Sequence, residues 1–311
     1  MINTLTLNPA VDKILYVDEF KRNITTRIKE VKDTIGGKGT HVSIDLSVMG
    51  DDSRAFGMAH GTTGKRVIDM LGGYEGLDVK FIFREEGETR TNYLLNEKNG
   101  DSTLITEKGM QLTDNDINDI IECMRENTEE GDFLALSGDA SNCADPYVYN
   151  RMLEALSEKG YHVFLDTSGE TLKKCIEYKP FLIKPNLDEL SYLVGREVED
   201  EDADILSAIR ELDPYGVPVI AVSLGGRGSI VRAGDSAYKV DPPDIDPVNT
   251  VGCGDCYLSG LLHGFSREMA TEDILAYATG VSAAAAMNEL SSGFDFGLAK
   301  ELEDRVKITR L

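Results

Sequence analysis

The second half of the chain alternates regularly between helical patterns and short apolar runs. Helices are predicted over 114–127, 145–158, 169–177, 186–194 and 201–212, and strands over 133–136, 162–166, 181–184 and 219–223, with a hairpin over 229–240. Parallel strands need a long connection, usually a helix, whereas antiparallel strands can be joined by a tight turn. The alternation therefore predicts an α/β fold built on a doubly wound, mostly parallel sheet.

The first third of the chain follows another pattern. Residues 2–7 predict a core strand that Asn8-Pro9 ends, and residues 53–58 predict a second one. The other strand-like segments are polar on both faces, and they lie over 13–17, 24–32, 79–84, 90–95 and 102–106. Asn99-Gly100 marks a hairpin between the last two. We expect these segments to form a small β lid over about 13–33 and 79–107, on a single domain that spans residues 1–311.

Composition restricts the partners of such a fold. Hydrophobic residues make up 41% of the 311, which is enough for a sizeable core. The net charge of -23 argues against a nucleic acid or an anionic membrane as a partner, so any anionic ligand must be held by local basic groups. The chain has no apolar run long enough to cross a membrane, no signal-peptide pattern and an odd count of 5 cysteines. We therefore expect a cytosolic protein.

Residues 249–265 carry the most specific chemistry. Gly252 and Gly254 flank the small Cys253, Asp255 follows, and apolar residues then recur at the spacing of a buried helix face. The glycines thus lie at a helix N-terminus, where free N–H groups and the helix dipole favour an anion. A carboxylate beside such a cradle suits phosphoryl transfer, because it can accept the proton of the attacking hydroxyl. The same residue types also occur where a helix is merely capped.

Three further segments fit ligand binding and also have simpler explanations. Asn186 and Glu189 open a helix, where they fit either a Mg²⁺ site reached through water or a capping box. The glycine-rich residues 223–228 fit either close approach of the backbone to a nucleotide or a hairpin turn. Gly36-Gly37-Lys38-Gly39, before a predicted helix, fits a ligand loop or a tight turn. Asp12 lies just past the first strand, where open α/β sheets bind ligands.

Six motifs, in this order and spacing, resemble the ribokinase-like carbohydrate kinases of the PfkB family. They are Asn8-Pro9-Ala10-Val11-Asp12, Gly36-Gly37-Lys38-Gly39, Asp166-Thr167-Ser168-Gly169, Lys184-Pro185-Asn186 through Glu189, Ser223-Leu224-Gly225 and Val251-Gly252-Cys253-Gly254-Asp255. The similarity covers essentially the whole chain. The first motif and the closing Val306-Lys307-Ile308-Thr309 look most like the branch that holds 1-phosphofructokinase and tagatose-6-phosphate kinase.

The resemblance implies an ATP-dependent, Mg²⁺-requiring kinase. Asp255 would be the catalytic base, and the backbone amides of Gly252, Cys253 and Gly254 would form the anion hole. The residues implied to surround ATP are Lys184, Asn186, Ser223, Gly225, Gly228 and Thr250, with Asn186 and Glu189 ordering Mg²⁺ through water. Those implied to hold the sugar phosphate are Asp12, Gly37, Lys38 and Arg90. The polar sheet would be the family's lid, through which two copies often pair, so that Arg27 of one copy reaches the substrate of the other.

Two residues on the acceptor side depart from the family. His41 replaces a sugar-contacting asparagine, and Asp139 replaces a serine that helps to bind the substrate's phosphate. Both are candidate substrate-binding residues. An ionised Asp139 at about 4 Å from one phosphate charge would cost about 4 kcal/mol at an effective dielectric constant of about 20. A protonated His41, or Arg90, would offset part of that repulsion.

We therefore predict phosphorylation of a hydroxyl of a sugar phosphate, of the 1-phosphofructokinase or tagatose-6-phosphate kinase type. Asp139 keeps open a second hypothesis, a kinase for an unphosphorylated sugar or a nucleoside. A third is a sugar-phosphate-binding regulator without turnover, against which the intact base and metal motifs argue. Cys253 and Cys256 form a Cys-x-x-Cys pair, which fits small residues in a tight space or a reactive thiol at a helix N-terminus.

Overall fold

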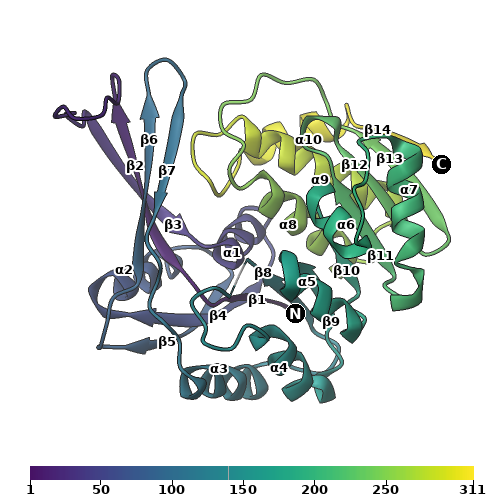
Figure 1. The fold of residues 1–311 in the computed structure, drawn as a ribbon, viewed down its shortest axis with the longest axis horizontal. Coiled ribbons are helices and arrows are strands. Elements are labelled where there is room, and N and C mark those ends of the chain that lie inside the picture. Colours follow the sequence, from purple (N-terminus) through teal and green to yellow (C-terminus); the bar gives the residue numbers. More distant parts are fainter. Residues whose placement is uncertain (139) are drawn as a thin grey trace.

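The computed structural model describes residues 1–138 and 140–311, and within these residues the strands form two sheets. The main sheet contains β1 (Ile2–Thr6), β4 (Ser53–His60), β5 (Leu77–Arg84), β8 (Phe133–Ser137), β9 (His162–Asp166), β10 (Leu182–Ile183), β11 (Val219–Ser223), β12 (Ser229–Ala233), β13 (Ser236–Asp241) and β14 (Lys307–Arg310). Their order is β14-β13-β12-β11-β10-β9-β8-β1-β4-β5 (Figure 1). All neighbours from β5 to β11 are parallel, and those from β11 to β14 are antiparallel. The predicted α/β class with a mostly parallel sheet is confirmed.

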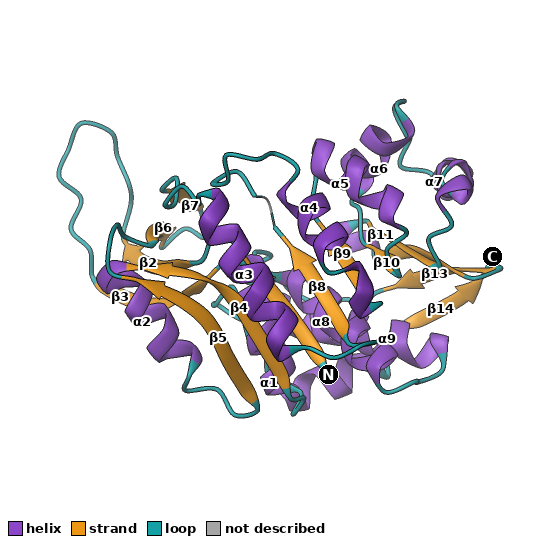
Figure 2. Cartoon of the chain, turned by 90° about the horizontal axis from the view of Figure 1, so that it is seen from below, coloured by secondary structure: helices purple, strands orange, loops and turns teal. Residues whose placement is uncertain are grey.

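Helices cover both faces of this sheet (Figure 2). One face carries α3 (Asp114–Asn127), α4 (Val148–Ala155), α5 (Gly169–Cys175), α6 (Leu187–Val194) and α7 (Asp202–Glu211). The other face carries α1 (Lys38–Val48), α2 (Gly61–Leu71), α8 (Cys253–Ser266), α9 (Thr271–Ala286) and α10 (Phe296–Glu303). Leu134 and Leu136 of β8 pack on the first side, whereas Ala135 packs on the second. Burial on both faces explains why these strands read as continuous apolar runs.

The second sheet is the lid. It contains β2 (Ala10–Val17), β3 (Glu30–Gly36), β6 (Arg90–Glu97) and β7 (Ser102–Thr106), in the order β3-β2-β6-β7. β2 is parallel to β6, and the two outer pairs are antiparallel. These strands project from the body as a long, narrow sheet (Figure 1). The predicted small β lid is therefore present, and the chain enters it directly from β1 and leaves it directly into α1.

Two strands differ from the sequence prediction. The strand expected over 79–84 joins the main sheet as β5 and not the lid, because Val79 and Phe81 pack against the α2 cluster while Ile82 packs on the opposite side. β3 begins at Glu30 and not at residue 24. Its described pairing with β2 covers Glu30–Gly36, and Ile24, although part of the alternating pattern, lies outside it and is exposed. Alternation alone therefore overestimates the length of this lid strand.

The helices agree with the prediction better than the lid does. α3 has the predicted bounds, and α4 is shorter because its last turn becomes the 3-10 helix Ser157–Lys159. Other 3-10 turns lie at Ile176–Tyr178, Asp213–Tyr215 and Gly225–Arg227. The patterns above predict nothing over 267–305, where α9 and α10 lie. α9 is rich in alanine and buried on most sides, so it lacks the one-sided apolar stripe of a surface helix.

The fold brings five strand ends to one place. The loops after β1, β8, β9, β10 and β11 meet at the carboxyl edge of the parallel sheet, facing the N-termini of α1 and α8. Three contacts mark this edge: the Gly138 amide donates to the Asp166 carbonyl at 2.9 Å, Lys184 pairs with Asp166, and the Ser223 amide donates to the Pro185 carbonyl at 2.9 Å. This edge is the expected place for a ligand site. Within the described residues, the helices are too short or too polar to cross a bilayer.

Candidate active site

The N-terminus of α8 is built on a glycine turn. Gly252 precedes the helix with φ +86°, a left-handed conformation, and a Cβ here would collide with the carbonyl oxygen of Ser291. In the described part of the chain, no side chain caps this helix and no hydrogen bond from the Gly254 amide is found. The turn therefore leaves a backbone N–H group and the positive end of the helix dipole available to an anion.

Asp255 lies in the first turn of α8, beside the glycine turn. It is 6% exposed, and its Oδ2 lies 2.8 Å from Nδ1 of His41 on α1. The amide of Asp255 donates to the Gly252 carbonyl at 3.0 Å, so the backbone here is already helical. The carboxylate thus faces α1 across the helix interface and does not accept from the amides of its own helix.

Two lysines approach the same helix end. Nζ of Lys184 lies 3.1 Å from Oδ1 of Asp166, and Nζ of Lys38 lies 3.6 Å from Oδ2 of the same carboxylate. A Cβ at Gly254 would lie 3.5 Å from Nζ of Lys184, so this ammonium group is next to the glycine turn. The Asp166 carboxylate raises the pKa of Lys38 against the effect of burial, and Asp255 adds to the rise. The site therefore holds two fixed positive charges beside the free amide.

Asn186 and Glu189 form a capping box at the start of α6. The Glu189 amide donates to Oδ1 of Asn186 at 2.8 Å, and the Asn186 amide donates to Oε2 of Glu189 at 2.9 Å. Burial raises the pKa of Glu189, and the nearby Asp166 adds to this rise. Oδ2 of Asp166 is buried and has no hydrogen-bond partner within the described residues. Within the described residues no group of three or more acidic, histidine or cysteine side chains could hold a metal ion directly, so a Mg²⁺ ion, which keeps several waters, would be held here only through water.

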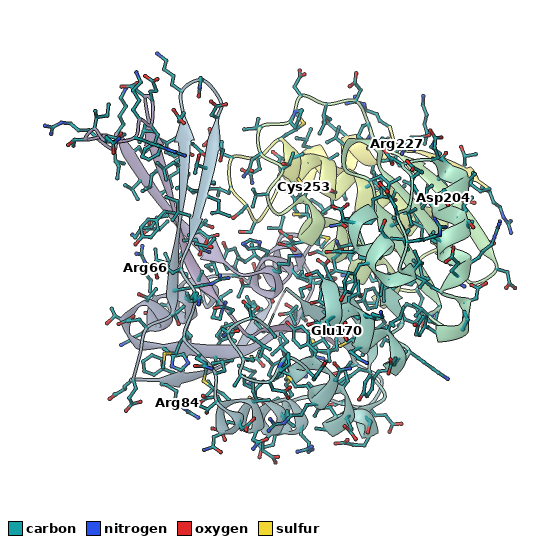
Figure 3. All side chains as sticks on the ribbon, in the orientation of Figure 1. Arg66, Arg84, Glu170, Asp204, Arg227 and Cys253 are labelled. Carbon is teal, nitrogen blue, oxygen red and sulfur yellow. The ribbon has the colours of Figure 1, made fainter. Side chains whose placement is uncertain are left out.

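A cleft of about 640 Å³ opens on the other side of the glycine turn. Residues predicted to surround ATP form part of its wall, namely Ser223, Gly225, Gly228 and Thr250, together with Cys253 and Gly254. Cys253 is labelled in Figure 3. Gly228 has φ +82°, and a Cβ there would collide with the Val240 carbonyl. The 223–228 segment therefore turns the chain into a hairpin and lines the cleft, and its close approach to a nucleotide stays a prediction.

The predicted acceptor residues lie on the lid strands β2 and β6, near the ends that join the body, and at the start of α1. Oδ1 of Asp12 accepts from Nδ2 of Asn92 at 2.8 Å, and a side chain at Gly36 would collide with the Asp12 carboxylate. Arg90 lies on the neighbouring strand, in register with Ala10, and its Nη2 donates to the Asn8 carbonyl at 3.0 Å. Gly37, with φ +116°, turns the chain into α1, which carries Lys38. Arg90 also lines a small pocket with Asn8 and Pro9, which does not include Asp12, Gly37 or Lys38 among its described lining residues. That the four residues share one acceptor site stays a prediction.

The two residues that depart from the family have different outcomes. His41 is buried, with Nδ1 on Asp255 and Nε2 at 3.0 Å from the Ile35 carbonyl. Both ring nitrogens are thus paired with protein atoms, and a contact between His41 and a sugar would have to break one of these hydrogen bonds. Asp139 lies outside the described residues, and its predicted substrate contact stays a prediction.

The cysteines of the glycine turn are not activated thiols. Burial raises the pKa of Cys253 to about 11, and the charge of Asp255 adds to this rise. The alternative of a thiol whose pKa is lowered by the helix N-terminus is therefore not supported, because desolvation and a neighbouring carboxylate outweigh the dipole. Cys256 lies on the buried face of α8, and its pKa is raised as well. Cys256 thus fills tight space, whereas Cys253 is partly exposed and lines the cleft.

Two acids near the site do not follow from any sequence motif. Asp45, one turn after His41, is fully buried and accepts from the Gly293 amide at 2.8 Å. Oε2 of Glu289 accepts from the Tyr16 hydroxyl and from Nζ of Lys32, both at 3.0 Å, and so connects the loop after α9 to the lid. These partners lie more than two hundred residues apart in the sequence, and an unusual charged residue within the apolar face of α1 is the signal that marks Asp45.

Proteins of known family and structure resemble this chain over nearly its whole length. The model of the pfkB family of carbohydrate kinases matches residues 5–293. The chain is 32% identical to 1-phosphofructokinase of Bacillus subtilis, with 100% of both chains covered, and 29% identical to tagatose-6-phosphate kinase of Staphylococcus epidermidis, with 99% of both covered. The structure of phosphofructokinase-2 from Escherichia coli in complex with substrates and products has the same fold, with a TM-score of 0.92 at 24% identity over 97% of this chain and 98% of that one. The family transfers a phosphoryl group to an alcohol acceptor. The chain therefore belongs to the pfkB family of carbohydrate kinases.

Proposed function

We propose that this kinase uses ATP to phosphorylate a hydroxyl of a sugar phosphate, with 1-phosphofructokinase and tagatose-6-phosphate kinase as the nearest types of reaction. The observation that carries the proposal is the meeting of three groups at the start of α8: the free Gly254 amide, Nζ of Lys184 and the carboxylate of Asp255. An anion hole, a cation and a carboxylate at one point supply what phosphoryl transfer needs. The names of the two relatives support the choice of acceptor class.

In this proposal Asp255 acts as the general base. Oδ2 is held by His41, and Oδ1 accepts the proton of the acceptor hydroxyl as its oxygen attacks the γ-phosphorus in line. The bond between that phosphorus and the ADP oxygen breaks, and the amides of Gly252 to Gly254 with Lys184 stabilise the negative charge on the transferred group. Closure of the lid over the proposed site would exclude water that otherwise hydrolyses ATP.

The nucleotide would occupy the cleft beside the glycine turn, with its terminal phosphate at the Gly254 amide. Asn186 and Glu189 would hold Mg²⁺ through water, and the ion would neutralise phosphate charge during transfer. On the other side, Asp12, Gly37, Lys38 and Arg90 would hold the acceptor. Lys38 would serve both the nucleotide side and the acceptor side, because the charges of Asp166 and Asp255 both raise the pKa of its ammonium group.

A second candidate is a kinase of an unphosphorylated sugar or nucleoside. It is favoured by Asp139 in the sequence, which stands where the family resemblance implies a serine that helps to bind the substrate's phosphate. Release of ADP should be measured with fructose 1-phosphate, fructose 6-phosphate, tagatose 6-phosphate, free sugars and nucleosides. Turnover restricted to the free sugars or nucleosides would replace the first candidate by the second.

The role of Asp255 is tested on whichever acceptor is turned over. Asp255→Asn should lower kcat by about 10²- to 10⁴-fold, because the hydroxyl proton then has no base, while the KM for ATP changes little. Asp273→Asn is the control, since it makes the same substitution in the first turn of another helix, α9, at an exposed position outside the site, and it should leave kcat unchanged. Near-normal turnover by Asp255→Asn would remove Asp255 from the mechanism.

We also propose that two copies pair through the lid. β7 is exposed along its whole length, and Leu104 and Ile105 on it are 53% and 49% exposed. Exposed apolar residues on an uncovered edge strand are typical of a pairing surface. Phosphofructokinase-2 from Escherichia coli has been solved in a tetrameric inhibited form, so a protein of this fold does assemble. Arg27 lies in the exposed loop between β2 and β3, where it would reach a partner.

A further inference from the structure

The His41 ring is hydrogen-bonded at both nitrogens. Nε2 lies 3.0 Å from the carbonyl oxygen of Ile35, and Nδ1 lies 2.8 Å from Oδ2 of Asp255. A carbonyl oxygen can only accept, so Nε2 carries a proton. At the other nitrogen, a bare lone pair facing a carboxylate oxygen at 2.8 Å would be repulsive, so a second proton lies between Nδ1 and Oδ2. With Asp255 ionised, as a base must be, His41 is an imidazolium ion.

The surroundings of the ring favour this charge. Burial opposes the imidazolium form, but the hydrogen bond from His41 to Asp255 and the charges of Asp255, Asp12 and Asp45 together raise the pKa of His41 above its ordinary value of 6.5. These carboxylates face the ring from three elements: Asp255 from α8, Asp12 from β2 and Asp45 from α1 itself. Burial raises the pKa of Asp45 to about 7, and its ionisation would strengthen the field around His41 further. The hydrogen bond to Asp255 and the charges of the three acids thus outweigh the cost of burying the imidazolium ion.

We propose that His41 is a positioning residue that holds the catalytic base through a shared proton. Its Nδ1–H group fixes Oδ2 of Asp255, so that Oδ1 is the oxygen left for the acceptor hydroxyl. This inference rests on the proposed role of Asp255. It assigns to His41 a task toward the base, whereas the family resemblance implied a contact with the sugar.

The proton balance of the reaction follows from this arrangement. The acceptor O–H bond breaks, and its proton moves to Oδ1 of Asp255. Nδ1 of His41 keeps its own proton, which stays hydrogen-bonded to Oδ2. The pair then carries one proton more than before, and this proton leaves to water when the phosphorylated product departs. His41 therefore does not take the hydroxyl proton, and it acts only through the carboxylate.

The pairing gives activity an alkaline limit. As the pH rises through the raised pKa of His41, Nδ1 loses its proton and its lone pair faces the ionised Asp255. The contact changes from attractive to repulsive, the carboxylate turns away, and kcat falls with the loss of one proton. Below that pKa the pair is intact.

A direct test is the titration of the four histidines by ¹⁵N NMR on the full chain, with His41 assigned by its loss in His41→Asn. We expect a doubly protonated His41 ring at neutral pH, and a fall of its pKa by about one unit or more in Asp255→Asn, where the side chain is neutral. A His41 ring that is singly protonated from pH 5 to 8, or that titrates alike in both proteins, would overturn the proposal. This readout does not depend on turnover.

Kinetics supply the second test. His41→Ala should lower kcat about 10- to 100-fold with a smaller effect on KM for ATP, because the base is misplaced while the nucleotide cleft is unchanged. His41→Gln keeps a neutral N–H donor, so it should recover part of kcat, and in both variants the alkaline limb of the wild-type profile should disappear. His162→Gln, which changes an exposed histidine on β9, is the control and should keep the wild-type profile.

The two proposals fail in different ways. If Asp255→Asn turns over normally, the proposed base is wrong, whatever His41 does. If Asp255→Asn is inactive but the His41 variants keep the wild-type kcat and alkaline limb, the base stands and the shared proton is wrong.

Discussion

Asp45 is a single buried acid near the site that destabilises the fold when it is ionised. Its carboxylate is fully buried between α1 and α8, where it accepts from the Gly293 amide at 2.8 Å and from the Ser259 hydroxyl at 3.3 Å. Burial dominates and raises its pKa from 3.8 to about 7, although hydrogen bonds with the Cys256 side chain and the Gly293 amide lower it. The acid therefore holds the turn that packs against Gly252, at the expense of stability whenever it is ionised.

This balance predicts how stability depends on pH. Between about pH 4 and pH 7 the folded chain keeps a proton on Asp45 that the unfolded chain has lost, so ionisation destabilises the fold by a contribution on the order of 4 kcal/mol, which is complete above pH 7. Asp45→Asn cannot ionise and should gain unfolding free energy relative to the wild type as the pH rises from 5 to 8. Urea denaturation at several pH values measures this difference. Parallel curves for the two proteins would contradict it, and the exposed Asp235→Asn should give parallel curves.

Some site residues can be predicted from a few neighbouring positions in the sequence, and others cannot. Gly252, Gly254 and Asp255 could be predicted because a glycine turn and the first helical residues lie within four consecutive positions. The link between His41 and Asp255 could not, since the two are separated by 214 positions and meet only when α1 packs on α8. The cap of Asn186 and Glu189 is local as well, and the sequence alone could not tell it from a metal site, because the same pair of residue types fits both; the structure shows the cap.

At the scale of elements, the lid was the hardest part to predict. Helices such as α3 carry a capping box and one apolar face, and their bounds follow from the sequence. Lid strands have neither, so the edge strand β5 and the loop before β3 were assigned to the wrong place. β5 differs from the lid strands only in that its apolar residues find helices on both sides of the sheet. That information is tertiary and is absent from a pattern of alternation.

The lid also carries a prediction about assembly. Replacing Leu104 and Ile105 by Ser should shift the protein from dimer to monomer, because two exposed apolar side chains are lost from the uncovered strand β7. Size-exclusion chromatography with light scattering measures the mass. Tyr178→Ser removes a side chain of similar exposure, 43%, from the body of the molecule and should leave the mass unchanged. A wild-type chain that is monomeric at every concentration would exclude pairing through the lid.

At the scale of the whole molecule, charge and site oppose each other. The chain carries a net charge of -23, while the ligands proposed for it are anionic and would be met by Lys38, Lys184 and Arg90 only at short range. Over distances beyond about 10 Å, the Debye length at about 0.1 M salt, an approaching nucleotide is therefore repelled. The local lysines act only after this barrier is crossed.

The association rate should accordingly rise with salt. For a fluorescent ATP analogue, the association rate constant should increase about two- to tenfold between about 10 mM and about 100 mM NaCl, because screening weakens the long-range repulsion first. Stopped-flow fluorescence measures this rate constant. A fluorescent nucleoside without phosphates should show no such change, and a rate that falls with salt for the ATP analogue would mean that the local cations dominate at all distances.

The path of the backbone through the lid has one last consequence. The chain leaves the main sheet after β1 and re-enters it at α1, and it leaves again after β5 and returns at α3. Each detour starts and finishes beside the carboxyl edge, so its length is independent of the alignment of the ten strands. Insertions or deletions near Asn23 or Asn99-Gly100, at the far tip, therefore leave that alignment unchanged. Evolution can vary the outer half of this projection in size while the body stays constant.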